Sequence, residues 1–389
     1  MTSELARAPE TSPLRVVSSY DEFTRLEEVI VGNPTGLTCF HFDNSFNLFY
    51  WGNVATFLQS RNYFRTHQGA VTWPVIPISQ RLMEELQEDI DELVRALTGA
   101  GVTVRRPPGV SGDTVFRTPL WESVQSAPLN VRDQAIVLGG TIVETAPHVR
   151  SRVFENDYLK PLFYEYFAAG ANWLQMPRPT LGAGSLDPSY HELSPEHLDI
   201  VGDHHTGRVD GLGLEIVFDG AQCVRLGADV LVNVANRNHE LGFDWLTRQF
   251  DGQMRFHRLN ALSDGHIDST LLPLRPGLWL VRDSRVLDAL PLGFRDWDHV
   301  VAPPTRREMF PSYEDDDIVI SSKFIDMNVL SVDEQTVVVN SLYPELIATL
   351  ERIGFTVIPV RHRHRRFFGG GFHCFTLDVR RRGGPDSYR

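Results

Sequence analysis

Residues 82–104, LMEELQEDIDELVRALTGAGVTV, contain a pattern that predicts the fold class of this chain. Apolar side chains recur at helical spacing behind Ser79, which predicts a helix capped by that serine, and Gly101 ends the helix before a strand pattern. The same succession of helix, glycine and strand returns in residues 346–357, LIATLERIGFTV, where Gly354 takes the place of Gly101. The repetition predicts an α/β protein built from similar units.

A second repeat sets a polar residue before two apolar strands joined by a turn, which is the pattern of a β-hairpin. It follows Asp133, Asp219 and Asp268, and a weaker form follows Asn328. If such units were arranged radially, the polar residues at the strand starts would converge on a central site. The spacing between the repeats is irregular, so a linear solenoid or two α/β domains remain alternatives at this point.

The composition of the 389 residues excludes several classes of protein. A hydrophobic content of 42% supports a sizeable core, and a net charge of −13 argues against non-specific binding of nucleic acid. No apolar run approaches the roughly 18 residues that a membrane helix needs. The three cysteines show no metal-type pairing such as C-x-x-C, so we expect no disulfide framework, no zinc or other metal site, and no cofactor.

The first residues of the chain do not have the pattern of a targeting signal. Residues 1–14 lack an apolar stretch and include two glutamates, so we expect them to form a disordered tail. The cysteine usage suits a reducing cytoplasm, which is the compartment we expect. Residues 15–389 are expected to form a single domain, on the resemblance described below.

Two segments have an unusual composition. Residues 40–64 carry many aromatic side chains, and we expect them to form either a substrate lid, an interface, or a loop packed by its own aromatic rings. Residues 361–366, RHRHRR, form a local basic run, which we interpret as solvated surface rather than as a site for a polyanion.

The segment 369–380, GGGFHCFTLDVR, places Cys374 directly behind three glycines and ahead of a short strand pattern. Glycines let the backbone turn sharply and approach a ligand closely, so a thiol behind them could lie at the floor of a pocket. The alternative is a small buried cysteine after a turn, as most lone cysteines are. The segment therefore makes Cys374 a candidate nucleophile.

A cysteine nucleophile needs a partner that lowers the pKa of its thiol or moves protons to a leaving group. His266 and Asp268 stand two residues apart at a strand start, so their side chains would project to the same face. Several carboxylates that enter one pocket with a cysteine and a histidine favour a planar cation, because a guanidinium group offers five N–H donors to carboxylates. The pattern fits the chemistry of arginine.

With these residues in place, the chain resembles the arginine amidinotransferase family, which includes arginine:glycine and arginine:inosamine-phosphate amidinotransferases. The resemblance covers nearly everything after about residue 15. The segments that carry it are residues 16–20, 26–32, 101–107, 218–221, 266–268, 321–323 and 374–383.

The resemblance implies a fold and a set of site residues. The implied fold is a five-bladed, pseudo-symmetric α/β propeller of ββαβ units, pentein-like and related to arginine deiminases. Cys374 would be the nucleophile, His266 the proton shuttle, and Asp219 the residue that supports His266. The implied substrate-binding residues are Asp133 and Asp268 for the guanidinium group, and Arg285, Ser321 and Ser322 for the carboxylate end.

The implied reaction moves the amidino group of L-arginine to the primary amine of an acceptor through an amidino-cysteine intermediate, with release of L-ornithine and ping-pong kinetics. Glycine-using members carry Met where this chain has Gly265, so we expect an acceptor bulkier than glycine. Only two lysines among 37 basic residues suggest a GC-rich genome, and we therefore expect a role in natural-product biosynthesis.

The relatives imply a homodimer. Two other functions stay open. One is a deiminase-type hydrolase, in which water resolves the Cys374 adduct, and the other is a non-catalytic propeller that binds a ligand.

Overall fold

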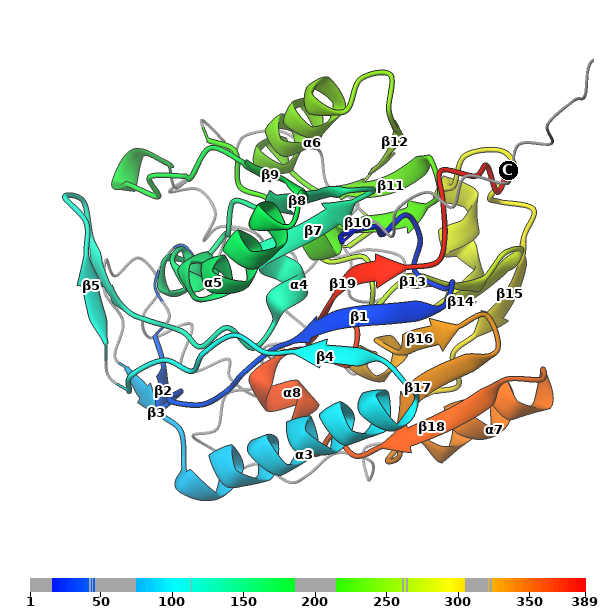
Figure 1. Cartoon of the computed structure of the whole chain (residues 1–389), viewed down its shortest axis with the longest axis horizontal. Helices are drawn as coiled ribbons and strands as arrows, with labels where there is room; N and C mark the ends of the chain where they lie inside the picture. Colours follow the sequence, from blue (N-terminus) through cyan, green and yellow to red (C-terminus); the bar gives the residue numbers. More distant parts are fainter. Residues whose placement is uncertain are drawn as a thin grey trace, which may run out of the picture.

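Five three-stranded sheets with the same internal order form the framework of the described chain (Figure 1). The computed structural model describes residues 16–41, 43, 45, 75–112, 114–185, 215–260, 262–263, 265–304, 321 and 324–389. The sheets are β7–β8–β9 (Ala135–Leu138, Thr141–Glu144, Asn172–Gln175), β10–β11–β12 (Cys223–Leu226, Asp229–Val234, Arg255–Asn260), β13–β14–β15 (Leu271–Arg275, Leu278–Val281, Asp298–Val301), β16–β17–β18 (Leu330–Asp333, Thr336–Asn340, Thr356–Val360) and β19–β1–β4 (Thr376–Arg381, Leu26–Val31, Thr103–Arg105).

In each sheet the first two strands pair antiparallel and the third joins the second in parallel. A parallel pair needs a crossover connection, and a helix provides it in every unit. The crossover helices are α5 (Glu155–Ala168), α6 (Arg237–Gln249), the 3₁₀ helix η7 (Ser284–Ala289), α7 (Pro344–Arg352) and α3 (Gln80–Gly99). The repeating unit is therefore strand, strand, helix, strand.

One of the five units is assembled from both ends of the chain. Its first strand, β19, pairs antiparallel with β1, and the partners run from Leu26 with Arg381 to Val31 with Thr376. The chain then continues from β1 through α3 to β4. Figure 1 shows the two strands side by side, one from each end of the colour scale.

The predicted helices are present where the apolar periodicity placed them. Helix α3 starts behind Ser79, whose hydroxyl accepts from the amide of Leu82 at 3.4 Å. Its apolar side chains pack against β1 in one buried cluster. Gly101 and Gly354 follow α3 and α7 with φ of 78° and 94°, a left-handed conformation that glycine adopts without strain.

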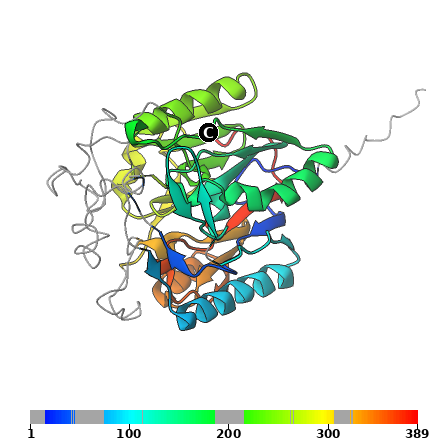
Figure 2. The same cartoon turned by 90° about the vertical axis from the view of Figure 1, so that its left-hand side faces the viewer.

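The crossover helices lie at the outside of the molecule. Figures 1 and 2 both show α3 and α6 at opposite sides, with the sheets between them. The remaining elements are short: β2 (Cys39–Phe40), β3 (Ile76–Pro77), β5 (Val115–Arg117), β6 (Glu122–Val124), α4 (Val131–Gln134), α8 (Arg365–Phe368), and the 3₁₀ turns η2 (Arg150–Arg152), η3 (Ala183–Ser185), η6 (Gly220–Gln222) and η9 (Ile325–Met327).

The interpretation of residues 361–366 as solvated surface is wrong for most of the run, although the side chain of Arg361 is 46% exposed. Arg365 is buried and its Nε lies 2.7 Å from Asp326 Oδ1, while Arg363 Nη2 lies 2.9 Å from Asp89 Oδ1. His362 and His364 are also buried. Charged side chains enter a protein interior when carboxylates pair with them, and here those carboxylates come from α3 and η9, which are distant in sequence.

Two other expectations fall wholly or largely outside the described residues. The tail over residues 1–14 is one, and the aromatic segment over residues 40–64 is the other, apart from its first few positions. In the part of the chain that the structure describes, no helix combines the length and apolar character required to cross a membrane.

Candidate active site

The residues that precede the first strand of each sheet meet at one place. Cys374 precedes β19, and its Sγ donates to Asp268 Oδ2 at 3.3 Å, while its backbone amide donates to Asn328 Oδ1 at 2.9 Å. Asp268 precedes β13 and Asn328 precedes β16. Asp133 and Asp219, which precede β7 and β10, both face the imidazole of His266. All five strand starts thus supply a polar group to a common site.

His266 lies between two carboxylates. Its Nε2 is 2.9 Å from Asp219 Oδ2 and 3.6 Å from Asp133 Oδ1, and its side chain is 15% exposed. Burial alone would lower the pKa of His266, but the charge of Asp133 and the hydrogen bond and charge of Asp219 outweigh it and raise the pKa to about 9. His266 is therefore an imidazolium at neutral pH and can act as a proton donor.

Asp219 is held in place by its own turn. It caps the 3₁₀ turn η6, and its backbone amide donates to Gln222 Oε1 at 2.9 Å. Burial opposes ionisation of Asp219, but the nearby His148 and His266 lower its pKa below the ordinary value. Asp219 therefore remains a carboxylate that accepts from His266.

Asp133 forms an ion pair with Arg152 and also faces the imidazole of His266. It lies in α4, and Arg152 Nη1 is 2.8 Å from Asp133 Oδ2. Arg152 also makes a bidentate pair with Glu155, at 2.9 Å for each bond. Burial raises the pKa of Asp133 above its ordinary value despite the charges of His266 and Arg152. Its Oδ1 lies on the side that faces His266 and the thiol.

The thiol of Cys374 is buried among negative charges. Burial first, and then the charges of Asp268 and Asp133, raise the pKa of the thiol well above its ordinary value. Asp268 itself is buried, yet its hydrogen bond and ion pair with His373 lower its pKa, so it stays charged. A cation that entered between these carboxylates and the sulfur would favour the thiolate.

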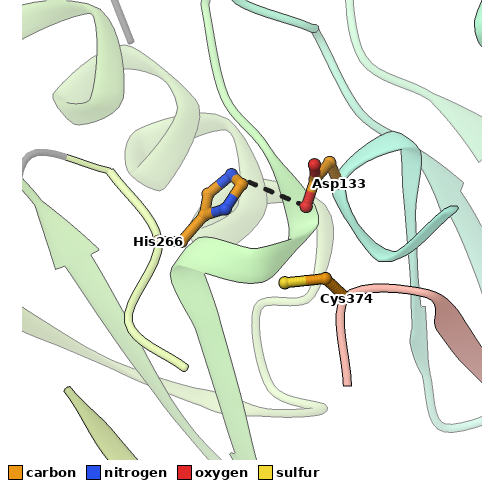
Figure 3. Close-up of side chains that lie close together, drawn as sticks. All are labelled: Asp133, His266 and Cys374. Atoms are coloured by element: carbon orange, nitrogen blue, oxygen red, sulfur yellow. Dashed lines mark ion pairs between the residues drawn. The ribbon is translucent and has the colours of Figure 1, made fainter. Parts of the chain in front are cut away.

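Asp133, His266 and Cys374 each offer one ligand-type atom within 4.8 Å of the other two (Figure 3). Thiolate, imidazole and carboxylate are all zinc ligands, so the three groups could hold a metal ion by geometry alone. The prediction of no metal site rested on the lack of metal-type pairing among the three cysteines, and this group combines one cysteine with residues far away in the chain. The same arrangement is also that of a nucleophile with its acid-base partner and a carboxylate for a cationic substrate.

Sequence reasoning did not identify the groups that hold these side chains. His373 Nδ1 is 2.8 Å from Asp268 Oδ2, and its Nε2 is 3.3 Å from Glu22 Oε2. Behind His373 lies a buried ion-pair network of Glu22 and Asp378 with Arg132, Arg225 and Arg381. The position of His373 next to Cys374 was the one signal available, whereas Arg152 and His148 follow a strand without any recognisable motif.

The glycines before Cys374 make room for protein side chains. Gly370 has a φ of 143°, and a Cβ there would collide with Asn130 Oδ1. A Cβ on Gly371 would lie 2.5 Å from the Cβ of Asn328, whose Oδ1 accepts from Cys374. The glycine segment therefore lets two asparagines fix the backbone of the thiol.

Gly371→Ala is expected to lower kcat about tenfold and to destabilise the fold by about 1–3 kcal/mol, because the added methyl overpacks against Asn328 and shifts the Cys374 loop. Steady-state rates and thermal unfolding measure the two effects. Gly99→Ala is the control, since no atom lies within 4 Å of a Cβ at that position. Equal behaviour of the two variants would contradict this account of the loop.

Three residues were predicted to bind the carboxylate end of arginine, and their surroundings differ. Arg285 is in η7, with its Nη2 2.7 Å from Asp283 Oδ2 and its side chain 53% exposed. Ser321 is buried, and its carbonyl accepts from Arg366 Nε at 3.2 Å. Ser322 lies outside the described residues. Their predicted role stays a prediction.

A scan against models of known protein families finds no match. Individual proteins do match along nearly the full length. Inosamine-phosphate amidinotransferase 1 of Streptomyces glaucescens is 34% identical over 378 residues, which span 97% of this chain and 100% of that protein. L-arginine:L-lysine amidinotransferase of Pseudomonas savastanoi pv. phaseolicola is 34% identical, with 97% of each chain covered.

Solved structures agree with these relatives. The inosamine-phosphate amidinotransferase of Streptomyces griseus superimposes with a TM-score of 0.79 at 32% identity, covering 96% of this chain and 99% of that one. DDAH of Pseudomonas aeruginosa, a dimethylarginine dimethylaminohydrolase, gives a TM-score of 0.53 at 13% identity, covering 91% and 99%. The second match supports the pentein fold alone. The chain therefore belongs to the amidinotransferase family and is a transferase of one-carbon groups with a pentein fold.

Proposed function

We propose that the protein transfers the amidino group of L-arginine to the primary amine of an acceptor and releases L-ornithine. The observation that carries this proposal is the grouping of one thiol, one imidazole and three buried carboxylates at the starts of the sheets. The carboxylates match a cation, and the thiol and imidazole provide a nucleophile and an acid. The substrates named for the relatives support arginine as the donor.

In the first half-reaction, Asp133 and Asp268 hold the guanidinium group against Cys374. The positive charge of the substrate offsets the carboxylates that otherwise keep the thiol protonated, so the thiol releases its proton to solvent when arginine binds and the thiolate forms. The thiolate attacks the guanidino carbon, and His266 donates its proton to the departing nitrogen. Ornithine leaves, and the amidino group stays bound to sulfur.

In the second half-reaction, the amine of the acceptor attacks the carbon of the amidino-cysteine. Neutral His266 takes a proton from this amine, while the bond between carbon and sulfur breaks and the thiolate of Cys374 is restored. Asp219 keeps the imidazole of His266 oriented in both half-reactions. We assign Arg285, Ser321 and Ser322 to the carboxylate end of arginine, a role that would require Arg285 to exchange Asp283 for the substrate.

The proposed architecture is a five-bladed propeller in one domain over residues 15–389. Its support is the identical strand order of the five sheets and the contacts among the residues at their strand starts. The three cysteines are unpaired with one another, which supports a reducing compartment, the cytoplasm.

The acceptor is proposed to be an amine larger than glycine, in a natural-product pathway. The relatives named above act, by their names, on inosamine phosphate and on lysine. Gly265, directly before His266, presents no side chain to the space beside the imidazole. Small residues at such a position leave room for a bulky ligand.

Incubation with labelled arginine and a panel of amines tests the proposed function, with mass spectrometry of the products and the enzyme. The expected result is ornithine, a new guanidine and a transient amidino adduct on Cys374. Initial rates at varied concentrations of both substrates should give parallel lines. Citrulline with ammonia would instead indicate hydrolysis, and glycine as much the best acceptor would overturn the proposed acceptor class.

A further inference from the structure

The carboxylate of Asp219 faces a second histidine besides His266. His148 Nδ1 lies 3.1 Å from Asp219 Oδ2, the same oxygen that is 2.9 Å from His266 Nε2. The side chain of His148 is 1% exposed, so solvent cannot replace this contact. His148 follows β8, on a segment that the proposed mechanism does not otherwise use.

A third histidine stands behind the second. His148 Nε2 and His239 Nε2 are 2.7 Å apart, and the two rings meet edge to face with centroids at 4.9 Å. His239 is in the first turn of α6 and is fully buried. Asn236, the cap of α6, accepts from the backbone amide of His239 at 3.0 Å, and its Nδ2 lies 3.2 Å from His239 Nε2. The ring of His239 is therefore fixed from more than one side.

The contact with the Ala235 amide indicates one arrangement of the ring protons, in which Asn236 Nδ2 lies near His239 Nε2 without donating to it. The backbone amide of Ala235 points at His239 Nδ1 at 3.2 Å, so that nitrogen accepts and cannot carry the ring proton. The proton of a neutral His239 is then on Nε2, the nitrogen 2.7 Å from His148 Nε2. This leaves the proton of a neutral His148 on Nδ1, the nitrogen 3.1 Å from Asp219 Oδ2. Burial and the neighbouring His148 lower the pKa of His239 well below its ordinary value, in agreement with a neutral ring.

We propose that His148, backed by His239, is a positioning residue for amidino transfer, which fixes the carboxylate of Asp219 so that it holds His266 over the thiol. The proposal rests on the transfer function argued above. Asp219 Oδ2 would then be restrained by two histidines, and two contacts hold a carboxylate oxygen in a narrower range of positions than His266 alone. A network of this kind has its effect on the orientation of the proton donor, not on the binding of the guanidinium group.

Two amide variants of His148 separate this role from simple packing. His148→Asn places a donor near the position of Nδ1, so it retains the contact with Asp219 Oδ2 and loses the contact with His239. His148→Gln reaches the position of Nε2, so it retains the contact with His239 and loses the one with Asp219. We expect kcat to fall no more than about threefold in the Asn variant and about tenfold or more in the Gln variant, which is the effect of one buried polar contact.

The Michaelis constant for arginine is expected to stay within about twofold of the wild-type value in both variants, because Asp133 and Asp268 still hold the guanidinium group. Thermal unfolding of each variant shows whether a loss of rate merely follows a loss of stability. His257→Leu is the matched control, since it removes another histidine that lies 2.6 Å from a buried aspartate, Asp229, at the other end of β10 and β11. Its kcat should remain within about twofold of wild type.

Equal kcat values for the Asn and Gln variants, or a loss that tracks the melting temperature alone, would overturn the positioning role. The wild-type enzyme tests the underlying function separately. If it forms citrulline instead of a new guanidine, transfer is wrong while the comparison of Asn with Gln still tests His148, because hydrolysis would use the same histidine. If wild type shows neither activity, both proposals fall.

Discussion

Cys374→Ala is expected to lower amidino transfer by at least about 10⁴-fold, because a methyl group cannot attack the guanidino carbon. The thiol is buried beside Asp268, and Asn328 holds its backbone, so the structure has no second nucleophile described at this place that could take its role. Ornithine formation from labelled arginine measures the loss. Mass spectrometry of the quenched protein should show an amidino adduct in wild type and none in the variant.

Cys39→Ala is the matched control for this experiment, since Cys39 is half-buried in the short strand β2, which forms a two-stranded sheet with β3 separate from the five sheets whose strand starts meet at the site. It should retain activity within about twofold, as surface and peripheral substitutions usually do. Arginine should still bind to Cys374→Ala, because the carboxylates remain. Turnover by Cys374→Ala near the wild-type rate would favour the non-catalytic, ligand-binding alternative.

His266→Gln is expected to lower kcat about 10³-fold, within the range that general acid-base catalysis contributes. Wild-type activity should also fall as the pH rises through about 9, because above its pKa His266 loses the proton that the departing nitrogen needs. The His266→Gln variant should not show this fall in activity at alkaline pH. The profile of kcat/KM against pH for both proteins is the measurement.

The raised pKa of His266 also predicts how the stability of the fold depends on pH. The pKa of His266 is raised from 6.5 to about 9 in the folded protein, so the stabilising contribution of its proton is fully present below about pH 6.5 and is lost as the pH rises through about 9. Wild type should lose free energy of unfolding over this interval relative to His266→Gln. Identical stability profiles for the two proteins would contradict the contact of His266 with Asp133 and Asp219.

Local patterns were enough to predict the repeating elements of the fold. The apolar spacing behind Ser79 predicted α3, and the polar residue before each hairpin predicted β7–β8, β10–β11 and β13–β14. These features depend on interactions between residues close in the chain, and the sequence displays them directly. The fifth unit was less apparent, since the strand after Cys374 finds its partner at the other end of the chain.

The sequence pointed to several of the groups that the structure brings together at the site and to few of the residues that surround them. A thiol behind glycines and a histidine two residues before an aspartate are recognisable at short range. Arg152, His148 and His373 acquire their roles through contacts with Asp133, Asp219 and Asp268, which the fold brings to them from other units. The error over residues 361–366 has the same origin, because a basic run shows its own charges and not the carboxylates that will cover them.

The pairing of β1 with β19 sets the time at which the enzyme can become active during translation. Leu26 leaves the ribosome long before Arg381, so β1 keeps one open hydrogen-bonding edge until residues 376–381 have been made. Cys374 emerges only just ahead of the strand that closes this edge. A nascent chain that stops before residue 374 therefore lacks the proposed nucleophile, and its β1 edge is a segment that a chaperone would need to shield.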